Sequence, residues 1–416
     1  MSRRVMPGLL IIGLTVGLVA GLSPVVGAQE TTPSPTPSGS PTASPTPTPT
    51  PTPTEPVPAV VKLKTNRRTI VIGGSVKLSG KVDPPIPADD VEILNESGRV
   101  VESVPMKADG SFATELSPRF NSRYTARHAG AESRSVPVKV RPKVSVQLGK
   151  VRLFDKAAAR GRVRPAVTGG RVELRLFRNG KKVATRNAKV GKKGRYRARL
   201  AIKHPGKHRV RAVYNPAVLL GDRDASTTRT TPLPSLSVGS GGVYVRALEK
   251  RLRSLGYYLP GANMSYDHKT SDAMIAFNKV QGRSRVGSVT PSTWHALASP
   301  KIPRPRSASP RYHLEIDQTK QVIYVVKKGR VRNILHTSTG AGGATRDGVF
   351  GFFRQVYGYS PNRLYYPSYF DGLRAIHGWP EVPTYPASHG CARVPMWAAT
   401  WIQGKADIGV EVRVYH

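Results

Sequence analysis

Cysteine is almost absent from this sequence, whose 416 residues contain only Cys391. The scarcity excludes an internal disulfide framework of the kind that stabilises many exported domains. A lone cysteine is a reactive thiol, a disulfide partner for another chain, or a small buried apolar side chain. Which of the three applies depends on the residues around Cys391.

Long apolar runs are missing after the N-terminus, so no later segment is expected to cross a bilayer. The chain begins with Arg3 and Arg4, an apolar stretch over residues 5–20, and small residues that end at Ala28. This order predicts a signal peptide over residues 1–28, with an uncleaved membrane anchor as the alternative. We therefore expect an exported protein of the cell wall or extracellular space. It would meet the membrane only through this segment, if the segment is not cleaved.

Acidic residues are scarce as well. The chain has 65 Lys and Arg against 25 Asp and Glu, a net charge of +40, and residues 143–233 hold 25 basic residues against 4 acidic ones. Such an excess often indicates nucleic-acid binding, but an exported chain meets little nucleic acid. We expect electrostatic retention by anionic wall polymers, or else a solvated basic surface, and no nucleic-acid partner.

Two stretches lack the apolar residues that a folded core requires. Residues 29–57 are nearly all Thr, Pro and Ser, and residues 300–310 are rich in proline and basic side chains. Proline fixes φ and removes a hydrogen-bond donor. We therefore predict an extended spacer at the first stretch and a linker between domains at the second.

An internal repeat fills residues 58–233. Short runs alternate apolar and polar residues, and turns containing glycine separate them. This pattern predicts two β-sandwich modules of the immunoglobulin-like type, over residues 58–142 and 143–233, without a disulfide. Neither module shows a polar constellation that suggests chemistry, so we expect a spacer or docking role. The matched positions of the two copies are Gly80 and Gly161, Gly98 and Gly180, Gly110 and Gly194, and Phe112 and Tyr196.

Residues 237–299 show a helical pattern instead. Val245, Leu248 and Leu252 recur on one helical face, and Thr290-Pro291 predicts an N-cap followed by proline at N1. The elements LxxLGY, TxxAxxxF and TxxxL resemble those of the three-helix peptidoglycan-binding domain. The resemblance implies wall binding, and a purely structural helix bundle is the alternative.

Residues 311–416 are expected to form a mostly-β domain. Its glycine loop, NILHTSTGAGG, lacks the Lys-Ser or Lys-Thr of a phosphate-binding loop. The stretch HGWPEVPTYPASHGCARVP places His377 fourteen positions before Cys391 and His389 two before it. A free thiol is largely protonated at neutral pH, so a nearby imidazole that accepts its proton would activate it. One Cys and two His at this spacing match no four-ligand zinc pattern, so no metal is expected.

Three motifs together resemble the YkuD-type L,D-transpeptidase domain. They are STG at residues 338–340, AIHG at residues 375–378 and the SHGC core that ends at Cys391. The resemblance covers essentially all of residues 311–416. It implies that Cys391 is the nucleophile and His377 the general base, oriented by the carbonyl of Gly378.

The other predicted site residues have supporting roles. Ser388 and His389 are expected to support the loop, and the amides of His389, Gly390 and Cys391 are expected to bind an oxyanion. Those expected to bind substrate are Arg393, Tyr366 and Tyr369, with an ion pair or core packing as the alternative. The chain departs from the family at residues 345–348, where TRDG replaces the frequent Thr-Pro-x-Gly, and at Ala392, where a larger aliphatic residue is usual.

The resemblance also implies the reaction. The thiolate would attack a stem tetrapeptide of peptidoglycan, release D-alanine and form a 3→3 cross-link without metal or cofactor. The implied partners are peptidoglycan stem peptides and glycan, and the implied inhibitors are carbapenems. An L,D-carboxypeptidase that uses the same thiol, and a non-catalytic wall-binding scaffold, are the alternatives. In all, we expect a multidomain chain of two β-sandwiches, a small three-helix bundle and a mostly-β catalytic domain.

Overall fold

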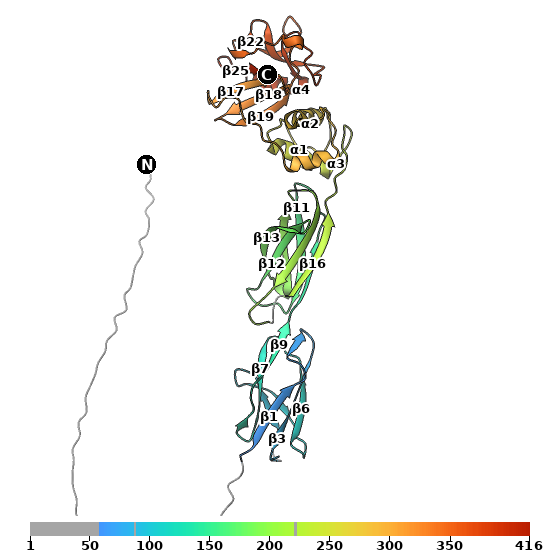
Figure 1. Ribbon diagram of the computed structural model, residues 1–416, viewed down its shortest axis with the longest axis vertical. Helices are drawn as coiled ribbons and strands as arrows, with labels where there is room; N and C mark the ends of the chain where they lie inside the picture. Colours follow the sequence, from blue (N-terminus) through green and yellow to red (C-terminus); the bar gives the residue numbers. More distant parts are fainter. Residues whose placement is uncertain (1–57, 87–88, 220–222) are drawn as a thin grey trace, which may run out of the picture. The chain divides into compact units, whose positions relative to one another are not determined.

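The computed structural model describes residues 58–86, 89–219 and 223–416 (Figure 1). The predicted signal peptide and spacer, residues 1–57, lie outside the described residues. The described part is multidomain and mostly β, with four α-helices, as expected from the sequence. None of its helices is long and apolar enough to cross a membrane.

The first β module consists of two sheets. Its strands are β1 (Val60–Thr65), β2 (Thr69–Val71), β3 (Val76–Asp83), β4 (Val91–Leu94), β5 (Val100–Val104), β6 (Ser111–Leu116), β7 (Ser122–His128), β8 (Ala131–Glu132) and β9 (Val136–Arg141). One sheet has the order β1-β3-β6, and the other has the order β2-β9-β7-β4-β5 with β8 paired to β7. Alternate positions, such as Leu78 and Ile93, are fully buried between the two sheets, which makes the module a β-sandwich.

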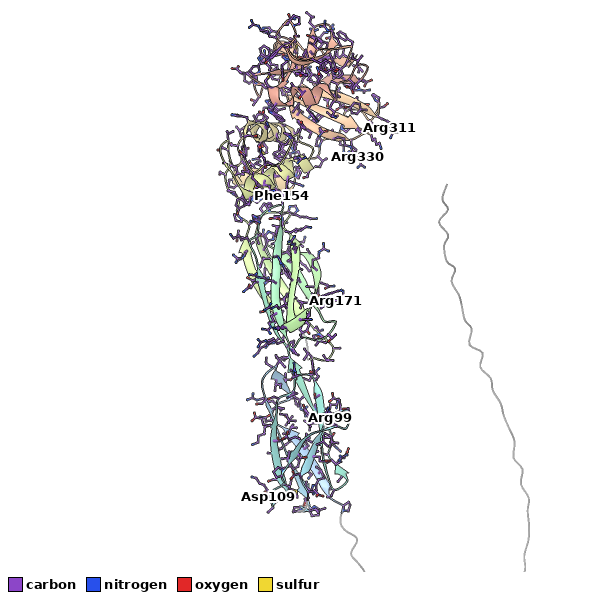
Figure 2. The ribbon with its side chains drawn as sticks, turned by 180° about the vertical axis from the view of Figure 1, so that it is seen from behind. Arg99, Asp109, Phe154, Arg171, Arg311 and Arg330 are labelled. Carbon is purple, nitrogen blue, oxygen red and sulfur yellow. The ribbon has the colours of Figure 1, made fainter. Side chains whose placement is uncertain are left out.

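The second β module repeats this arrangement. Its elements are β10 (Lys143–Leu148), β11 (Lys156–Arg164), β12 (Arg171–Arg178), β13 (Lys181–Lys189), the short 3₁₀ turn η1 (Lys192–Gly194), β14 (Arg195–Ala201), β15 (Lys207–Tyr214) and β16 (Arg223–Thr230). The sheets have the orders β10-β11-β14 and β13-β12-β15-β16. Leu174 and Leu200 are buried between them, whereas basic side chains such as Arg171 are exposed (Figure 2).

The repeat seen in the sequence is a repeat of packing. Gly80 is the cross-strand partner of Phe112, and Gly161 is the partner of Tyr196. A Cβ on Gly80 would lie 2.2 Å from the ring of Phe112, and a Cβ on Gly161 would lie 2.4 Å from the Tyr196 hydroxyl. Each glycine therefore leaves the space that the aromatic ring on the neighbouring strand occupies. The assignment of both sandwiches to the immunoglobulin-like type stays a prediction.

Three helices follow, α1 (Val243–Ser254), α2 (His268–Gln281) and α3 (Pro291–Ala298). Val245, Leu248 and Leu252 of α1 are fully buried, as their spacing predicted. Helix α3 begins after Thr290 with a reciprocal capping box and proline at its first position. Helix α2 begins after Asp267, whose side chain caps it by accepting from the Thr270 amide.

The C-terminal domain contains two sheets and one helix. Its strands are β17 (Tyr312–Asp317), β18 (Val322–Lys327), β19 (Val331–His336), β20 (Gly348–Gly351), β21 (Arg354–Gln355), β22 (Tyr365–Asp371), β23 (Arg374–Trp379), β24 (Ala392–Pro395) and β25 (Glu411–Tyr415), with the 3₁₀ turn η2 (Ala341–Gly343) and helix α4 (Met396–Gln403). The sheet orders are β19-β18-β17-β25-β20 and β21-β22-β23-β24. Apolar side chains from both sheets and α4 share one core.

Candidate active site

Two neighbouring parallel strands place the predicted catalytic residues on one face of the smaller sheet. His377 on β23 pairs with Arg393 on β24, and Cys391 immediately precedes β24. Because strand side chains alternate, the side chain two positions before Arg393 lies on the same face as His377. Ile376, which precedes His377, and Ala392, which lies between Cys391 and Arg393, point to the other face and are buried in the core. His377, Cys391 and Arg393 accordingly line one pocket of about 690 Å³.

The imidazole of His377 is held by the peptide that follows it. Its side chain is almost fully buried, and Nδ1 lies 3.0 Å from the carbonyl oxygen of Gly378. A carbonyl only accepts, so Nδ1 carries the proton and Nε2 keeps its lone pair. The indole of Trp379 packs edge-on against the imidazole at 5.6 Å between ring centroids. This geometry leaves His377 with an unprotonated nitrogen able to accept a proton.

Hydrogen bonds from the hydroxyls of Ser388 and Thr345 fix the loop that carries Cys391. Ser388 Oγ donates to the carbonyl of Cys391 and accepts from the amide of Gly390 at 3.1 Å. Thr345 Oγ1 donates to the carbonyl of Gly390 at 2.8 Å. The Gly390 amide is thus engaged within the loop, so it is not free to bind an oxyanion. The amides of His389 and Cys391 stay the candidates for that role.

Burial dominates the ionisation of both predicted catalytic groups. Burial raises the pKa of the Cys391 thiol above its ordinary value, against the opposing effects of the Ala375 backbone and of Arg393 and Arg374. Burial also lowers the pKa of His377 to about 4, with a further lowering from Arg393. At neutral pH the resting pair is therefore a thiol and a neutral imidazole, not a thiolate–imidazolium pair.

Two further predicted residues lie at the pocket. The guanidinium of Arg393 stacks over the Trp379 ring at 5.1 Å, and it forms no ion pair with any residue that the structure describes. The side chain of His389 lines the pocket and is exposed. Both side chains are placed where they can contact a substrate. The ion pair that was the alternative role of Arg393 is not formed among the described residues.

The structure does not bring the two predicted tyrosines to this pocket. Tyr369 is 3% exposed, and the guanidinium of Arg354 covers its ring at 3.9 Å. Tyr366 packs against Tyr365 and Tyr357 instead. Proximity to the motif in sequence was the only signal for a substrate contact, and it does not say which way a strand residue points. Core and aromatic packing, the alternative, describes both residues.

Comparison with sequence families decides the nature of the domain. Residues 311–414 match the sequence model of the YkuD family, the L,D-transpeptidase catalytic domain. The C-terminal domain is an L,D-transpeptidase catalytic domain. Residues 241–297 match the model of a peptidoglycan-binding domain. Together the two domains support a peptidoglycan-modifying enzyme associated with the cell wall.

Individual relatives resemble parts of the chain. A crystal structure of the L,D-transpeptidase from Xylanimonas cellulosilytica is 37% identical, with a TM-score of 0.42, and the match covers 44% of this chain and 99% of that one. An L,D-transpeptidase structure from Stackebrandtia nassauensis is 25% identical, with a TM-score of 0.28, over 44% of this chain and 95% of that one. The N-acetylmuramoyl-L-alanine amidase CwlL of Bacillus licheniformis is 37% identical over 90 residues. That match spans 20% of this chain and 25% of the amidase.

The L,D-transpeptidase pocket also has walls that the sequence motifs did not indicate. Leu373 and Arg374 line it from the hairpin between β22 and β23, whose tip contains Gly372 at a φ of 53°. The Cys391 sulfur lies 3.7 Å from the carbonyl of Leu373, and the Leu373 side chain is 72% exposed. The Asp-Gly pair between two apolar runs was a sequence signal for this hairpin, but not for its position over Cys391.

Arg374 belongs to a charged network behind the same hairpin. Its guanidinium donates to the carbonyl of Ala344 at 2.7 Å and to Asp371 at 3.0 Å. Arg346 also donates to Asp371, and this pair holds the pKa of the Asp371 carboxyl below its usual value. Arg346 stands where the family often has proline, so the departure in sequence corresponds to an added ion pair beside the pocket.

The peptidoglycan-binding domain contacts the L,D-transpeptidase domain directly. The ring of Tyr258 stacks on Trp401 of α4 at 3.7 Å, and its amide donates to the carbonyl of Ile334 on β19 at 3.0 Å. The indole nitrogen of Trp397 donates to the Asp272 carboxylate of α2 at 2.8 Å. Burial raises the pKa of Asp272 to about 6. Helical and catalytic domains are therefore packed together through both apolar and polar contacts.

Proposed function

We propose that this protein is a cysteine-dependent L,D-transpeptidase that forms 3→3 cross-links in peptidoglycan. The observation that carries the proposal is the shared pocket of Cys391 and His377, in which Nδ1 of His377 is fixed on the Gly378 carbonyl. That hydrogen bond selects the tautomer whose Nε2 accepts a proton. Nucleophile, base and orienting group are the parts that acyl transfer needs.

In the first half-reaction, Nε2 of His377 takes the thiol proton as the Cys391 sulfur attacks the carbonyl carbon of the donor. That carbonyl belongs to the diamino acid at position three of a tetrapeptide stem. The C–N bond to the terminal D-alanine then breaks, and the imidazolium returns the proton to the leaving amine. A thioester remains on Cys391.

In the second half-reaction, the side-chain amine of another stem attacks the thioester carbonyl. His377 accepts a proton from this amine, the C–S bond breaks, and the sulfur recovers a proton to regenerate the thiol. The products are a new amide, which is the 3→3 cross-link, and the free enzyme. Each proton that His377 accepts is returned within the cycle, and no atom changes its oxidation state.

The supporting residues fit this chemistry. The amides of His389 and Cys391 would bind the oxyanion, each such donor being worth about 3 kcal/mol in comparable enzymes. Arg393, stacked on Trp379 and without an acidic partner among the described residues, would bind a carboxylate of the stem. The helical domain would hold the enzyme on its polymer and so raise the local substrate concentration. We also propose export to the wall, where this substrate is found.

The test is to incubate the full chain with purified disaccharide-tetrapeptide and to record the intact protein mass and the products. We expect a covalent adduct equal to the donor minus D-alanine, absent in Cys391→Ala, and cross-linked dimers among the products. Tripeptide monomers alone would show that water is the acceptor, which is the carboxypeptidase alternative. Unmodified protein with unchanged tetrapeptide would contradict both.

A matched pair of histidine variants separates the base from a general effect. His377→Gln should lower the acylation rate at least about 100-fold, since general-base catalysis contributes that order. His295→Gln changes an exposed histidine of α3 and should leave the rate unchanged.

A carbapenem, which carries a strained amide, should acylate Cys391 as a donor does and give the corresponding mass increase. No adduct in the wild-type chain would count against the nucleophile assignment.

A further inference from the structure

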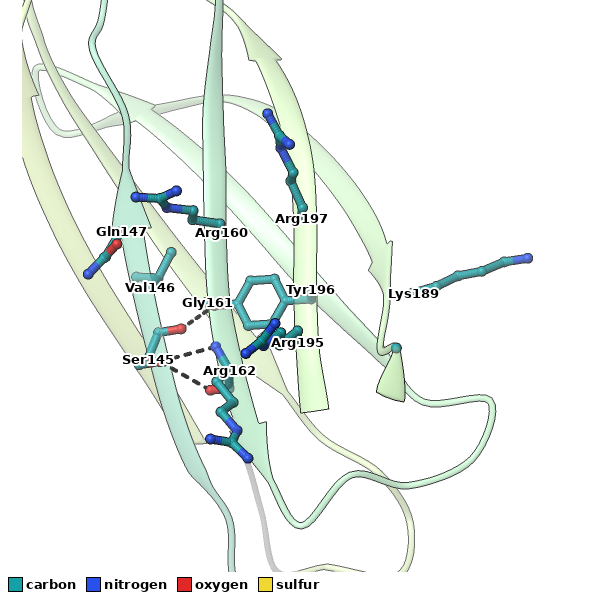
Figure 3. A pocket seen from close by; sticks show the side chains of 11 residues that line it. Ser145, Val146, Gln147, Arg160, Gly161, Arg162, Lys189, Arg195, Tyr196 and Arg197 are labelled. Atoms are coloured by element: carbon teal, nitrogen blue, oxygen red, sulfur yellow. Dashed lines mark hydrogen bonds between the residues drawn. The ribbon is translucent and has the colours of Figure 1, made fainter. Parts of the chain in front are cut away.

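One face of the second β-sandwich carries arginines at neighbouring positions of adjacent strands. Alternate residues of β11 and β14 are buried, and the positions between them are exposed. The exposed positions include Arg160, Arg162, Arg195 and Arg197. We call these four residues the arginine face. All four line a hollow of about 740 Å³ beside Tyr196 (Figure 3).

Strand register places these arginines directly opposite one another. Arg160 pairs with Arg197 and Arg162 pairs with Arg195 in the antiparallel ladder. Like charges at directly opposed positions destabilise a sheet. The four opposed charges therefore lower the stability of the sheet, and uncharged side chains would suit these exposed positions better. Their presence indicates a role other than stability.

Nothing in the described part of the protein neutralises the face. None of the four arginines forms an ion pair with a described carboxylate, although three other arginines of this module do. Arg162 donates to the backbone carbonyl of Lys193 at 2.8 Å, which fixes its side chain but leaves its charge unbalanced. Figure 3 shows the four arginines on the neighbouring strands around Tyr196, whereas Lys189 extends away from them.

The internal repeat supplies a control for this reasoning. Aligning Gly80 with Gly161 and Phe112 with Tyr196 matches Arg160 to Ser79, Arg162 to Lys81, Arg197 to Ala113 and Arg195 to Ser111. The same sandwich therefore folds with at most one charge at these four positions. Residues 58–142 hold 14 basic and 9 acidic residues, against 25 and 4 in residues 143–233. The arginine face is thus specific to the second copy and is not demanded by the fold.

We propose that the arginine face is a binding site for a linear polyanion built on phosphodiesters, as found among the glycopolymers of bacterial walls. One guanidinium group donates two parallel hydrogen bonds to two oxygens of a phosphate, a geometry that a lysine ammonium cannot offer. Rows of charge separated by about 5 Å across strands and about 7 Å along them give an extended chain successive contacts. Binding here would retain the enzyme in the wall independently of its helical domain.

The test measures the affinity of the full chain for fluorescent poly(glycerol phosphate) by anisotropy, over a range of salt concentrations. Arg160→Ser, Arg197→Ala and Arg195→Ser, combined, install the residues of the first copy. The charge-matched control combines Arg171→Ser, Lys181→Ser and Arg186→Ser, which are exposed on strands β12 and β13 of the other sheet. Thermal unfolding of each variant monitors folding.

We expect the first variant to lose at least about tenfold in affinity and about two units of salt slope, because about three phosphate contacts are removed. The control should lose less than about threefold, through its smaller net charge alone. The first variant should unfold at the same temperature as the wild type or higher, since opposed like charges are gone. Carbapenem acylation of Cys391 should be unchanged in both, so that a failure here is distinct from a failure of the proposed catalysis.

Three outcomes would overturn the proposal. Equal losses in the two variants would show that net charge, and not the arginine face, determines binding. Equal affinity for polyglutamate, lost equally in the first variant, would replace phosphate by carboxylate as the ligand. Tighter binding of single-stranded DNA than of poly(glycerol phosphate) would point to base contacts that a wall polymer does not have.

Discussion

The Nζ of Lys279 lies 2.7 Å from Nδ1 of His336, and both side chains are almost fully buried. Lys279 belongs to α2 of the peptidoglycan-binding domain, and His336 ends β19 of the catalytic domain. Nε2 of His336 donates to the carbonyl of Val382 at 2.9 Å, so Nδ1 is the acceptor. Burial lowers the pKa of His336 to about 3, which keeps the imidazole neutral at physiological pH. The contact links the two domains through a buried lysine with a fixed partner.

Lys279 has two more acceptors, the carbonyls of Gln321 and Thr337, each at 2.9 Å. Thr337 precedes Ser338, whose amide and carbonyl both pair with Arg393 beside the pocket. The lysine therefore fixes the start of the loop that borders the active site. Helix α2 of the peptidoglycan-binding domain is in this way connected to β24 through the Lys279 side chain and the backbone of Thr337 and Ser338.

Replacing Lys279 by methionine should destabilise the protein and slow catalysis. Methionine keeps the volume but leaves three buried acceptors without a donor, which should cost about 3 kcal/mol of unfolding free energy. Denaturant unfolding and the rate of Cys391 acylation by a carbapenem measure the two effects. Lys269→Met, at an exposed position of the same helix, is the control. Equal unfolding free energies for the two variants would show that the buried contact contributes nothing.

Local patterns in the sequence predicted the local features. The spacing of Val245, Leu248 and Leu252 predicted a buried helical face, and Thr290-Pro291 predicted the start of α3, because both depend on residues within a few positions. The alternating runs separated by glycine turns predicted a β-sandwich in each module. The HG and SHGC motifs predicted that His377 and Cys391 act together. The structure places both at one pocket, with His377 on β23 and Cys391 just before the neighbouring β24.

Contacts between distant segments were not predictable in this way. Lys279 and His336 are 57 positions apart, and nothing in a single sequence pairs them. Leu373 was missed because its place over Cys391 depends on how one hairpin closes against another loop. Tyr369 was expected near substrate, but its strand turns the ring into packing under Arg354. The face of the sheet to which a strand side chain points depends on the register of the strand, which the sequence leaves open.

Acid should destabilise the catalytic domain through its buried histidines. The pKa of His377 is about 4 in the folded protein and about 6.5 in an unfolded chain. The unfolded state therefore binds more protons below pH 6.5, so this contribution to stability is complete above pH 6.5 and is lost as the pH falls toward 4. The loss should reach about 3 kcal/mol. Unfolding by guanidinium from pH 8 to pH 5 should show a shallower dependence for His377→Gln than for His295→Gln.

The resting thiol should react slowly with simple alkylating agents. Burial raises the pKa of Cys391, and no resting thiolate–imidazolium pair offsets this. The rate of iodoacetamide alkylation, followed by intact mass, should therefore rise through a midpoint above that of free cysteine, which is about 8.5. Acylation by a carbapenem should keep its rate down to about pH 5, because His377 stays unprotonated there. An alkylation midpoint well below that of free cysteine would contradict the neutral resting pair.

Leu373 should contribute to substrate binding without affecting folding. Its side chain is 72% exposed on the hairpin tip, lines the pocket, and has its carbonyl 3.7 Å from the Cys391 sulfur. Leu373→Ser removes an apolar contact worth about 1.5 kcal/mol, so KM for the tetrapeptide donor should rise about tenfold with kcat little changed. Ile408→Ser, an exposed residue that does not line the pocket, controls for the loss of surface apolar area. A fall in kcat at unchanged KM would instead assign Leu373 to holding the Cys391 loop.

Variants of Arg393 and Trp379 separate two properties by which Arg393 would bind the stem carboxylate, namely its positive charge and the fixed geometry of its planar guanidinium. Its guanidinium stacks over Trp379 at 5.1 Å, and this contact orients the planar donor group toward the pocket. Arg393→Lys keeps the charge but loses both the stack and the paired donors, so the donor KM should rise about tenfold. Trp379→Leu should produce a similar rise, since it frees the guanidinium while leaving the charge in place. If both variants keep the wild-type KM while Arg393→Gln does not, a point charge suffices and the stacking has no part in recognition.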